Sequence, residues 1–299
     1  MNDSLRQREM LAAAASLIRL ARPRDWIKNV FVLLPVPFAL KAGATLEPVV
    51  PFLLGLVGFC LVNSSIYTLN DLFDADSDRL HPQKASRPIA AGLVSRRAAR
   101  LQIAVLLAAG LALSLLTHKP DVVAIVLAYV AINVGYNLGL KHVALLDVFM
   151  LGSGFVIRVL LGCALLGVLP SAWLLLCTST LALFLGFAKR RADLTEGLDH
   201  HHRPSLRGYS LPFLDQAMSI CAGVAILSYA LYSIDAKVLL EGREMASLPF
   251  VAFGILNYLR LADVHGIGGS PVEVAFHSLT TQVCAVGWLV AVTWSMGLW

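Results

Sequence analysis

The sequence predicts an all-α, polytopic membrane protein. Hydrophobic residues make up 58% of the 299-residue chain, charged residues make up only 14%, and the mean hydropathy is +0.73. Apolar runs recur from one end of the chain to the other. A helix of about 20 apolar residues is long enough to cross the hydrocarbon core of a bilayer. We therefore expect a protein built from membrane-spanning helices, with no separate soluble domain.

A basic, amphipathic segment precedes the first apolar run. Within residues 1–28, leucine and isoleucine side chains alternate with basic ones. The basic residues are Arg6, Arg8, Arg19, Arg22, Arg24 and Lys28. A helix of this composition typically lies in the membrane interface and leads into the first span.

Nine apolar segments follow, and they predict nine transmembrane helices within a single domain, residues 29–299. The segments are 29–44, 47–69, 97–116, 121–138, 144–166, 171–188, 213–235, 246–261 and 276–297. Most of the 24 Lys and Arg residues fall at alternate ends of these segments, on the side of the N-terminus. The positive-inside rule then places the N-terminus in the cytoplasm and the C-terminus outside. The long polar loops 70–96, 189–212 and 262–275 are all expected on the cytoplasmic side.

Charged residues are concentrated in one stretch, residues 70–92, directly after the second predicted span. If that helix continues into the stretch, a rotation of ~100° per residue places Asp71, Asp74 and Asp78 within about 60° of one another. Asp76 then points away from them. Carboxylates that share one face repel one another and need a compensating cation.

Mg²⁺ is the cation that this pattern favours, because it binds through one or two carboxylates together with substrate phosphates. Three basic residues, Arg79, Lys84 and Arg87, follow the aspartates and are suited to bind phosphate oxygens beside the metal. Asn70 is expected to donate to a phosphate oxygen or to orient a carboxylate. The alternative is a solvated acidic helix end, balanced by Arg79 and Lys84 without a ligand.

The same stretch resembles a known family. The pattern Asn-Asp-x-x-Asp-x-x-x-Asp-Arg that begins at Asn70, with Arg87-Pro88-Ile89 downstream, is similar to the first aspartate-rich motif of the UbiA superfamily of intramembrane prenyltransferases. The nine predicted spans agree with a UbiA-type bundle with cytoplasmic cap loops. Further segments resemble the polyprenyl-phosphate phosphoribosyltransferase branch. They are RPRDWIKN at 22–29, YNLGLKH at 136–142, Arg158, AKRRADL at 188–194 and GGSPVE at 268–273.

The resemblance extends from about residue 19 to residue 275 and implies a reaction. In this branch Mg²⁺, bound by Asp71, Asp74 and Asp78, assists transfer of a 5-phosphoribosyl group from 5-phosphoribose 1-diphosphate to a polyprenyl phosphate. The alternative within the superfamily is transfer of a prenyl group from a prenyl diphosphate to an aromatic or lipid acceptor. That reaction uses a second DxxxD motif, whereas this chain offers Asp193 and Asp199, six residues apart. A transporter or cation channel is a third, non-enzymatic hypothesis.

Several other residues have two interpretations each. Lys28, Lys141, Lys189 and Arg190 are either basic residues at the ends of spans or, by the resemblance, ligands of substrate phosphates. Tyr136 belongs to the segment that includes Lys141 and is assigned to substrate binding with it. Arg158 lies within a span, where a cation costs roughly 2.5–3.5 kcal/mol, so we expect it to line the polar site rather than to pair with another helix.

The chain departs from the branch pattern at Arg191, where an aromatic residue is expected, and at Asp193, where glutamate is expected. The expected partners are the bilayer, the polyprenyl phosphate and 5-phosphoribose 1-diphosphate, with no nucleic acid. The resemblance implies the bacterial inner (plasma) membrane, with the active site on its cytoplasmic side. The oligomeric state, a homo-oligomer included, stays open.

Overall fold

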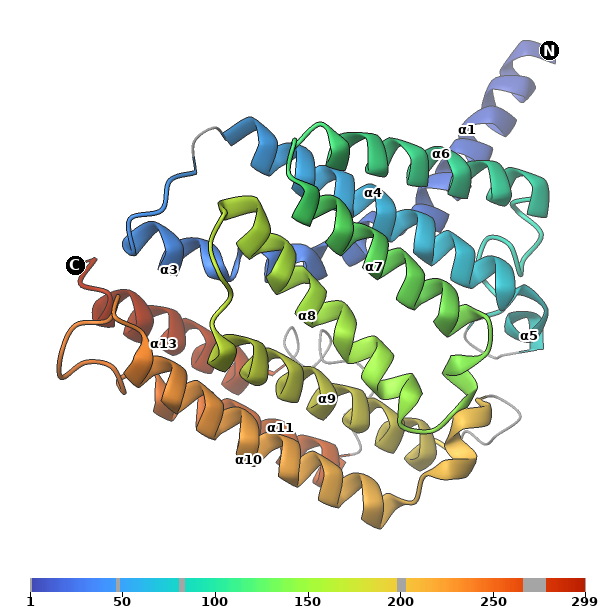
Figure 1. The fold of residues 1–299 in the computed structure, drawn as a ribbon. Helices are drawn as coiled ribbons and strands as arrows, with labels where there is room; N and C mark the ends of the chain where they lie inside the picture. The colour runs from blue at the N-terminus through green and yellow to red at the C-terminus, as the bar shows by residue number, and fades with distance from the viewer. Residues whose placement is uncertain (1, 47–48, 81–83, 198–202, 266–277, 299) are drawn as a thin grey trace. The chain divides into compact units, whose positions relative to one another are not determined.

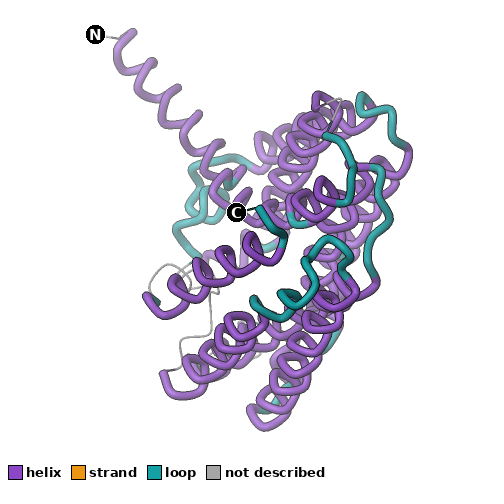
Figure 2. Tube along the Cα trace, turned by 90° about the vertical axis from the view of Figure 1, so that its left-hand side faces the viewer, coloured by secondary structure: helices purple, strands orange, loops and turns teal. Residues whose placement is uncertain are grey.

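The computed structural model describes residues 2–46, 49–80, 84–197, 203–265 and 278–298. Every regular element within these ranges is an α-helix or a 3₁₀ helix (Figure 2). The all-α prediction is therefore confirmed. The motif at 268–273 and Asp199 lie outside the described residues. The chain divides into two compact units, and each is described below by itself.

The first unit comprises Met1–Leu34, Thr45–Leu138 and Leu160–Gly167. Its elements are α1 (Asn2–Ala21), η1 (Pro23–Asn29), α2 (Val30–Leu33), α4 (Val49–Phe73), α5 (Ala75–Leu80), α6 (Arg96–Leu115) and α7 (Pro120–Asn137). The long helix α4 packs mainly against α6 and also contacts α7, α1 and η1. The N-terminal part of α1 extends past the other helices of this unit (Figures 1 and 2).

Small residues let α4 and α6 approach each other closely. A Cβ atom added to Gly110 would lie 2.7 Å from the carbonyl oxygen of Gly58, and one added to Gly58 would lie 2.9 Å from the oxygen of Gly110. Neither distance is compatible with a larger side chain unless a backbone moves. Within membranes, where lipid tails are as apolar as leucine, this close packing of small residues is a principal source of helix association. The contact fixes α4, the helix that leads into the acidic stretch.

A small apolar cluster packs around the acidic stretch. Leu20 at the end of α1, Ala75 in α5, Ile89 and Val94 in the connection, and Ala99 in α6 are all buried and packed together. The Ile89 side chain comes from the turn that also carries Arg87, and Ala75 lies between the aspartates. The cluster therefore ties the turns around the aspartates to both neighbouring helices.

The second unit comprises Pro35–Ala44, Gly139–Val159 and Val168–Trp299. Its elements are α3 (Pro35–Lys41), η2 (Leu140–His142), the first part of α8 (Leu146–Leu166), α9 (Ala172–Thr195), η3 (Pro204–Gly208), α10 (Leu211–Asp235), α11 (Leu248–His265) and α13 (Leu279–Ser295). Helix α10 packs against both α9 and α11, and α13 packs on α11. These four helices can be followed in Figure 1. Phe184, Leu214 and Met218 are among the fully buried side chains that join α9 to α10.

Six helices of the described chain are long and apolar enough to cross a membrane: α4, α6, α7, α8, α9 and α10. This supports an integral membrane protein. The apolar helix α13 is shorter, with 17 residues. The predicted number of nine spans is therefore not confirmed.

The first predicted span, residues 29–44, is not one continuous helix. It is divided into the end of η1, the four-residue α2 and the seven-residue α3, with a turn at Leu34. Pro35 starts α3, and proline disfavours the α conformation in the residue before it and cannot donate a backbone hydrogen bond. The segment is apolar, but the prolines at 35 and 37 leave only short helical pieces within it.

Candidate active site

The aspartates of the acidic stretch lie on a helix that bends but does not end. Helix α4 stops at Phe73 and α5 starts at Ala75, yet the N–H of Asp74 donates to the Asn70 oxygen at 2.9 Å and the N–H of Asp78 donates to the Asp74 oxygen at 2.8 Å. The helical phase is thus kept through the bend. Asp71 and Asp78 are buried and Asp76 is exposed, which agrees with Asp76 pointing away from the other aspartates. Asp74 is half-buried.

Two arginines neutralise the two buried carboxylates. Arg22 donates from Nη2 to Oδ1 of Asp71 at 2.5 Å. Arg87 lies between the carboxylates, with Nη1 3.1 Å from Oδ1 of Asp71 and 2.8 Å from Oδ2 of Asp78. A buried carboxylate is stable only when a charge or several hydrogen bonds compensate it. Arg87 therefore lies beside both aspartates, and its predicted role in binding a substrate phosphate stays a prediction.

The N-terminal 3₁₀ helix η1 is held on the side of α4. Trp26 donates from Nε1 to the hydroxyl of Ser64 at 2.9 Å, and Asn29 donates to the sulfur of Cys60 at 3.1 Å. Between these anchors Lys28 pairs with Asp25 at 2.7 Å, and its ammonium lies 5.5 Å from the centre of the Tyr67 ring. Lys28, on η1, therefore lies beside α4, the helix that carries Asp71.

The end of α7 contacts the start of the motif. Asn137 donates from Nδ2 to the side-chain oxygen of Asn70, and also to the backbone oxygen of Asn133 at 2.9 Å. Because the Asn70 oxygen accepts this bond, its amide nitrogen is the end suited to donate to a substrate oxygen. Tyr136, the neighbour of Asn137, is half-buried at the same end of α7.

The carboxylate oxygens of the aspartates are suitable ligands for a divalent cation. Oδ2 of Asp71 is buried and has no hydrogen-bond partner among the described residues. An unmatched buried carboxylate oxygen is costly, and a hard cation is a suitable partner for it. No group of three or more His, Cys, Asp or Glu in the described part of the chain is arranged to hold a metal by itself. Mg²⁺ does not require one, since it takes its remaining ligands from substrate phosphates and water.

Arg79 lies on the exposed side of the motif. It pairs with Asp76 at 3.1 Å and donates from Nε to the backbone oxygen of Ala90 at 3.2 Å. Arg96 also pairs with Asp76, at 2.6 Å, and this hydrogen bond holds the pKa of Asp76 below its usual value. Lys84 is half-buried, and its backbone oxygen accepts from the N–H of Arg87 at 2.9 Å.

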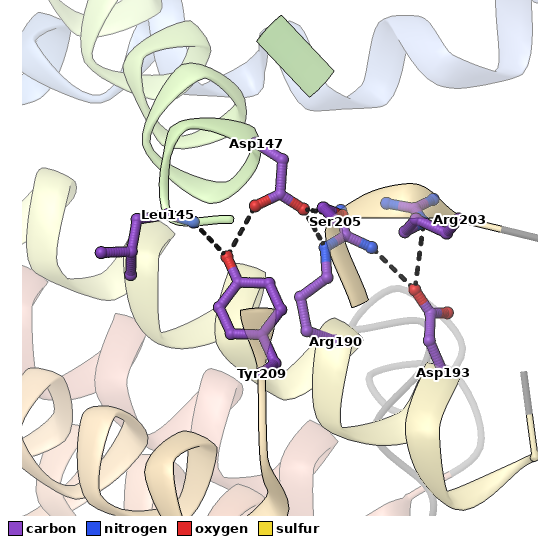
Figure 3. Close-up of polar contacts among 7 residues, drawn as sticks. All are labelled: Leu145, Asp147, Arg190, Asp193, Arg203, Ser205 and Tyr209. Carbon is purple, nitrogen blue, oxygen red and sulfur yellow. Dashed lines mark hydrogen bonds and ion pairs between the residues drawn. The ribbon is translucent and has the colours of Figure 1, made fainter. Parts of the chain in front are cut away.

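A second polar cluster lies in the other unit, around Asp147 near the start of α8 (Figure 3). The Asp147 side chain is fully buried. It accepts from Nε of Arg190 at 2.7 Å, from the hydroxyl of Ser205 at 2.9 Å and from the hydroxyl of Tyr209 at 2.6 Å. Three donors from α9 and the following connection therefore converge on one carboxylate.

The geometry of α9 explains how Arg190 reaches Asp147. Gly186 lies one turn before Arg190 on the same face of the helix, and a Cβ atom there would lie 2.6 Å from Cγ1 of Val148. The small residue thus allows α8 and α9 to meet. Nη1 of Arg190 also pairs with Asp193 at 2.7 Å, and Arg203 approaches the same Asp193 oxygen at 3.5 Å. Arg190 is completely buried, and its Nη2 has no hydrogen-bond partner among the described residues.

Tyr209 links this cluster to the chain that leads into α8. Its hydroxyl accepts from the N–H of Leu145 at 2.7 Å while it donates to Asp147. Leu145 has a φ of 71°, in the left-handed region that residues with a side chain seldom adopt. Burial, followed by the hydrogen bond to Asp147, raises the pKa of Tyr209. The hydroxyl therefore keeps its proton at neutral pH and remains a donor.

Arg191 connects three helices. It donates from Nε to Asp215 of α10 at 2.5 Å, from Nη1 to the Ala262 oxygen of α11 at 2.8 Å and from Nη2 to Asp263 at 2.8 Å. The arginine that departs from the branch pattern is thus fully used in holding α9, α10 and α11 together. Its neighbour Lys189 is exposed.

Arg158 is buried in α8, where its Nη1 donates to the Gly154 oxygen at 2.6 Å and its guanidinium lies 5.6 Å from the centre of the Phe155 ring. Asp147, which lies too far along the same helix to reach it, is engaged by the Arg190 cluster instead. Lys141 is half-buried in η2.

Sequence reasoning did not select Arg22, Tyr67, Ser205 or Tyr209 for any role. Arg22 stands in the quoted segment RPRDWIKN, so a signal for it was present. Asp147 stands inside the apolar run 144–166. A carboxylate inside an apolar run is itself a signal, because it must find a donor within the protein. Ser205 and Tyr209 lie in the polar connection between α9 and α10, where no sequence pattern distinguishes them from their neighbours.

Comparison with known proteins identifies the family. A family model described as the UbiA prenyltransferase family matches residues 29–263. The chain belongs to this family. A UbiA-family relative, the decaprenyl-phosphate phosphoribosyltransferase of Corynebacterium glutamicum, is 32% identical over 301 residues, which cover 98% of this chain and 90% of that protein. The enzyme of the same name from Mycolicibacterium smegmatis is 33% identical, covering 92% of this chain and 90% of the relative.

A solved structure supports the UbiA fold. The UbiA homolog from Archaeoglobus fulgidus bound to DMAPP and Mg²⁺ superposes with a TM-score of 0.71, at 18% identity, over 93% of this chain and 99% of that one. The predicted resemblance to the superfamily and to its phosphoribosyltransferase branch is confirmed. So is the prediction of a transferase.

Proposed function

We propose that this UbiA-family protein transfers the 5-phosphoribosyl group of 5-phosphoribose 1-diphosphate to a polyprenyl phosphate and releases diphosphate. The observation that carries the proposal is the similarity, over almost the full chain, to relatives named decaprenyl-phosphate phosphoribosyltransferase. The length of the prenyl chain is left to experiment.

The donor diphosphate binds at the acidic stretch in this proposal. Arg87 lies between Asp71 and Asp78, where its guanidinium can contact a phosphate oxygen while it remains close to both carboxylates. Lys28 and Lys84 supply further positive charge, and Asn70 supplies an amide donor. Arginine and lysine beside carboxylates suit a ligand that carries both phosphates and a metal ion.

Asp71, Asp74 and Asp78 would hold Mg²⁺, and the unmatched Oδ2 of Asp71 supports this assignment. When bound, Mg²⁺ offsets the negative charge that develops on the diphosphate leaving group. The protein's own contribution is to position the donor and to surround its phosphates with fixed positive charge. Such positioning and electrostatic stabilisation supply much of the rate in reactions of this type.

The acceptor needs no strong base. A phosphate monoester is already ionised at neutral pH, so its oxygen can attack C1 of the ribose directly. The new C1–O bond forms as the bond between C1 and the diphosphate breaks, and the diphosphate leaves with the electron pair. No proton has to be removed, so the reaction does not depend on a general base.

Six further residues are proposed as substrate contacts. Arg79 is a basic residue that follows the aspartates, and Arg158 is a cation within a span. Tyr136, Lys141, Lys189 and Arg190 are assigned through the family resemblance. Lys189 is exposed and Lys141 is half-buried, so both side chains can reach a polar ligand. Arg190 is already engaged by Asp147 and Asp193, and only its Nη2 lacks a partner among the described residues. We propose that the protein lies in the bacterial plasma membrane with this site in the cytoplasm, as the distribution of basic residues favours.

Transfer of a prenyl group from a prenyl diphosphate is the second candidate function. It is favoured by the fold shared with the Archaeoglobus fulgidus homolog, which was solved with DMAPP. Its weak point is the second aspartate motif. Asp193, the aspartate of that stretch that lies among the described residues, contacts the guanidinium groups of Arg190 and Arg203.

One assay separates the two functions. The purified protein in detergent is incubated with Mg²⁺ and decaprenyl phosphate, together with 5-phosphoribose 1-diphosphate labelled in its ribose. Parallel reactions contain a labelled prenyl diphosphate and an aromatic acceptor. We expect label from the ribose to enter the lipid phase only when the polyprenyl phosphate is present. Consumption of the prenyl diphosphate without transfer of ribose would establish the second candidate instead.

A further inference from the structure

Arg22 has an unusual backbone and a side chain directed at the proposed metal site. Its φ of 50° and ψ of 55° lie in the left-handed region, and Pro23 follows it. Residues with a side chain seldom adopt this conformation, and where they do the surrounding contacts hold them there. At Arg22 the backbone N–H donates to the Arg19 oxygen at 3.3 Å, the backbone oxygen accepts from Asp25 at 2.9 Å, and the side chain pairs with Asp71 at 2.5 Å.

The Arg22 side chain is also held from a second direction. Its guanidinium lies 5.6 Å from the centre of the Tyr67 ring, one helical turn before Asp71 on the same helix. An aromatic ring attracts a cation over its face without forming a covalent or hydrogen-bonded link. Arg22 can therefore shift its hydrogen bonds between anions in this region while the ring continues to support it.

The two buried carboxylates of the site, those of Asp71 and Asp78, are paired with arginines in the substrate-free structure. The arginines are Arg22 and Arg87. A divalent cation that entered alone would add two positive charges beside these arginines, which is unfavourable. A cation that enters with a diphosphate brings its own negative charge, and the arginines then gain phosphate oxygens in place of the carboxylate.

We propose that Arg22 is a positioning residue that serves as the counter-charge of Asp71 in the substrate-free enzyme and moves its hydrogen bonds to the donor diphosphate when the metal binds. The proposal rests on the proposed function, in that the donor carries a diphosphate. Its consequence is that metal and donor bind interdependently, since each removes a cost that the other would meet alone. By linkage, the donor raises the affinity for the metal by the same factor as the metal raises the affinity for the donor.

The test measures Mn²⁺ binding by electron paramagnetic resonance on the full-length protein in detergent, first without any substrate. We expect Arg22→Gln to bind Mn²⁺ about tenfold more tightly than the wild type, a change equivalent to roughly 1.4 kcal/mol. Arg24→Gln is the matched control, because Arg24 is exposed on the same segment and its removal changes the net charge equally. It should leave the Mn²⁺ affinity unchanged.

The second arm repeats the titration with 5-phosphoribose 1-diphosphate, and separately with inorganic diphosphate. In the wild type these ligands should raise the Mn²⁺ affinity strongly, and in Arg22→Gln the increase should be several-fold smaller. Arg22→Gly is a second variant, since glycine adopts the left-handed conformation without strain and keeps the turn. It should behave like Arg22→Gln, so a folding defect in one variant does not prevent the test.

The direction of the change in Mn²⁺ affinity decides between the proposal and a purely structural role of Arg22. A residue that only supported the fold, or only helped to bind the metal, would lower the Mn²⁺ affinity when removed. A substrate-free affinity in Arg22→Gln and Arg22→Gly that is equal to or weaker than that of the wild type would overturn the proposal. The substrate-free arm contains no donor, so its result does not depend on which reaction the enzyme performs. Loss of the effect of 5-phosphoribose 1-diphosphate alone, with inorganic diphosphate still effective, would instead count against the proposed function.

Discussion

Arg190 and Asp147 form an ion pair in which both side chains are fully inaccessible to solvent, with Nε of the arginine 2.7 Å from Oδ2 of the aspartate. The two residues lie 43 positions apart, on α9 and α8. Ser205 and Tyr209 donate to the same carboxylate, so the pair also fixes the described part of the connection after α9. A buried pair need not be more stable than an apolar one, but removal of one partner leaves a buried charge without compensation.

Removal of the Asp147 carboxylate should therefore be strongly destabilising. We expect Asp147→Ala to lower the free energy of unfolding by about 3–5 kcal/mol, the range found when one partner of a buried ion pair is deleted. Denaturant unfolding in detergent measures the change. Arg207→Ala removes an exposed charge from η3 and should change stability by less than about 0.5 kcal/mol. A loss of stability in Asp147→Ala as small as that in Arg207→Ala would show that the cluster does not stabilise the fold.

Tyr209 should make stability depend on alkaline pH. Its pKa is raised in the folded protein, so its contribution is complete below the unfolded pKa of about 10 and is lost as the pH rises toward the folded value. Above pH ~10 the unfolded chain releases this proton and the folded protein keeps it, so the free energy of unfolding falls by up to about 1.4 kcal/mol per pH unit.

The comparison with Tyr209→Phe isolates this effect. The variant lacks the titrating hydroxyl, so the stability difference between wild type and variant should become smaller as the pH rises above about 10. Unfolding is followed from about pH 8 to about pH 11. A difference that stays constant over this range would mean that Tyr209 titrates equally in the folded and unfolded states.

The crossing of α4 and α6 should not tolerate even one methyl group. Replacement of glycine by alanine within a helix ordinarily stabilises by up to about 1 kcal/mol. In Gly110→Ala the new Cβ would lie 2.7 Å from the Gly58 oxygen and 2.6 Å from Cγ2 of Val62, so we expect a loss of about 1–3 kcal/mol. In Gly223→Ala nothing lies within 4 Å of the new atom, and stability should be unchanged or higher. Thermal unfolding of the two variants tests the opposite signs.

Local features of the fold and of the site were accessible from the sequence. The separation of Asp76 from Asp71 and Asp78 follows from helical rotation, which depends only on spacing along the chain. The apolar runs identified the long helices in the same way. The division of 29–44 is also encoded locally, in the prolines at 35 and 37, although the apolar composition of the segment favours one continuous span.

The partners of charged side chains that lie far apart in the sequence could not be predicted from it. Arg191 contacts Asp215, Ala262 and Asp263, which lie 24, 71 and 72 positions away, and no spacing rule connects them. From the sequence, Arg190 could be either a basic residue that flanks a span or a phosphate ligand. Only the folded chain reveals that it forms an ion pair with Asp147. A charged side chain in the sequence gives its charge but not its partner, because the partner depends on how helices pack.

The aspartates themselves can be tested by substitution. We expect Asp74→Ala to abolish phosphoribosyl transfer without unfolding the protein, because its half-buried side chain is assigned to the metal and its backbone hydrogen bonds are kept. Asp76→Asn is the control, since Asp76 is exposed and directed away from the other aspartates. It should retain transfer. Wild-type activity in Asp74→Ala would remove this residue from the proposed metal site.

The mass of the lipid product is the most direct test of the proposed reaction. After incubation of the purified protein with Mg²⁺, 5-phosphoribose 1-diphosphate and decaprenyl phosphate, the lipid phase is extracted and analysed by mass spectrometry. The proposed function predicts a lipid that carries one phosphoribosyl unit in addition to its own phosphate, formed together with one equivalent of diphosphate. Recovery of unmodified decaprenyl phosphate, from protein that prenylates an aromatic acceptor in a parallel reaction, would contradict it.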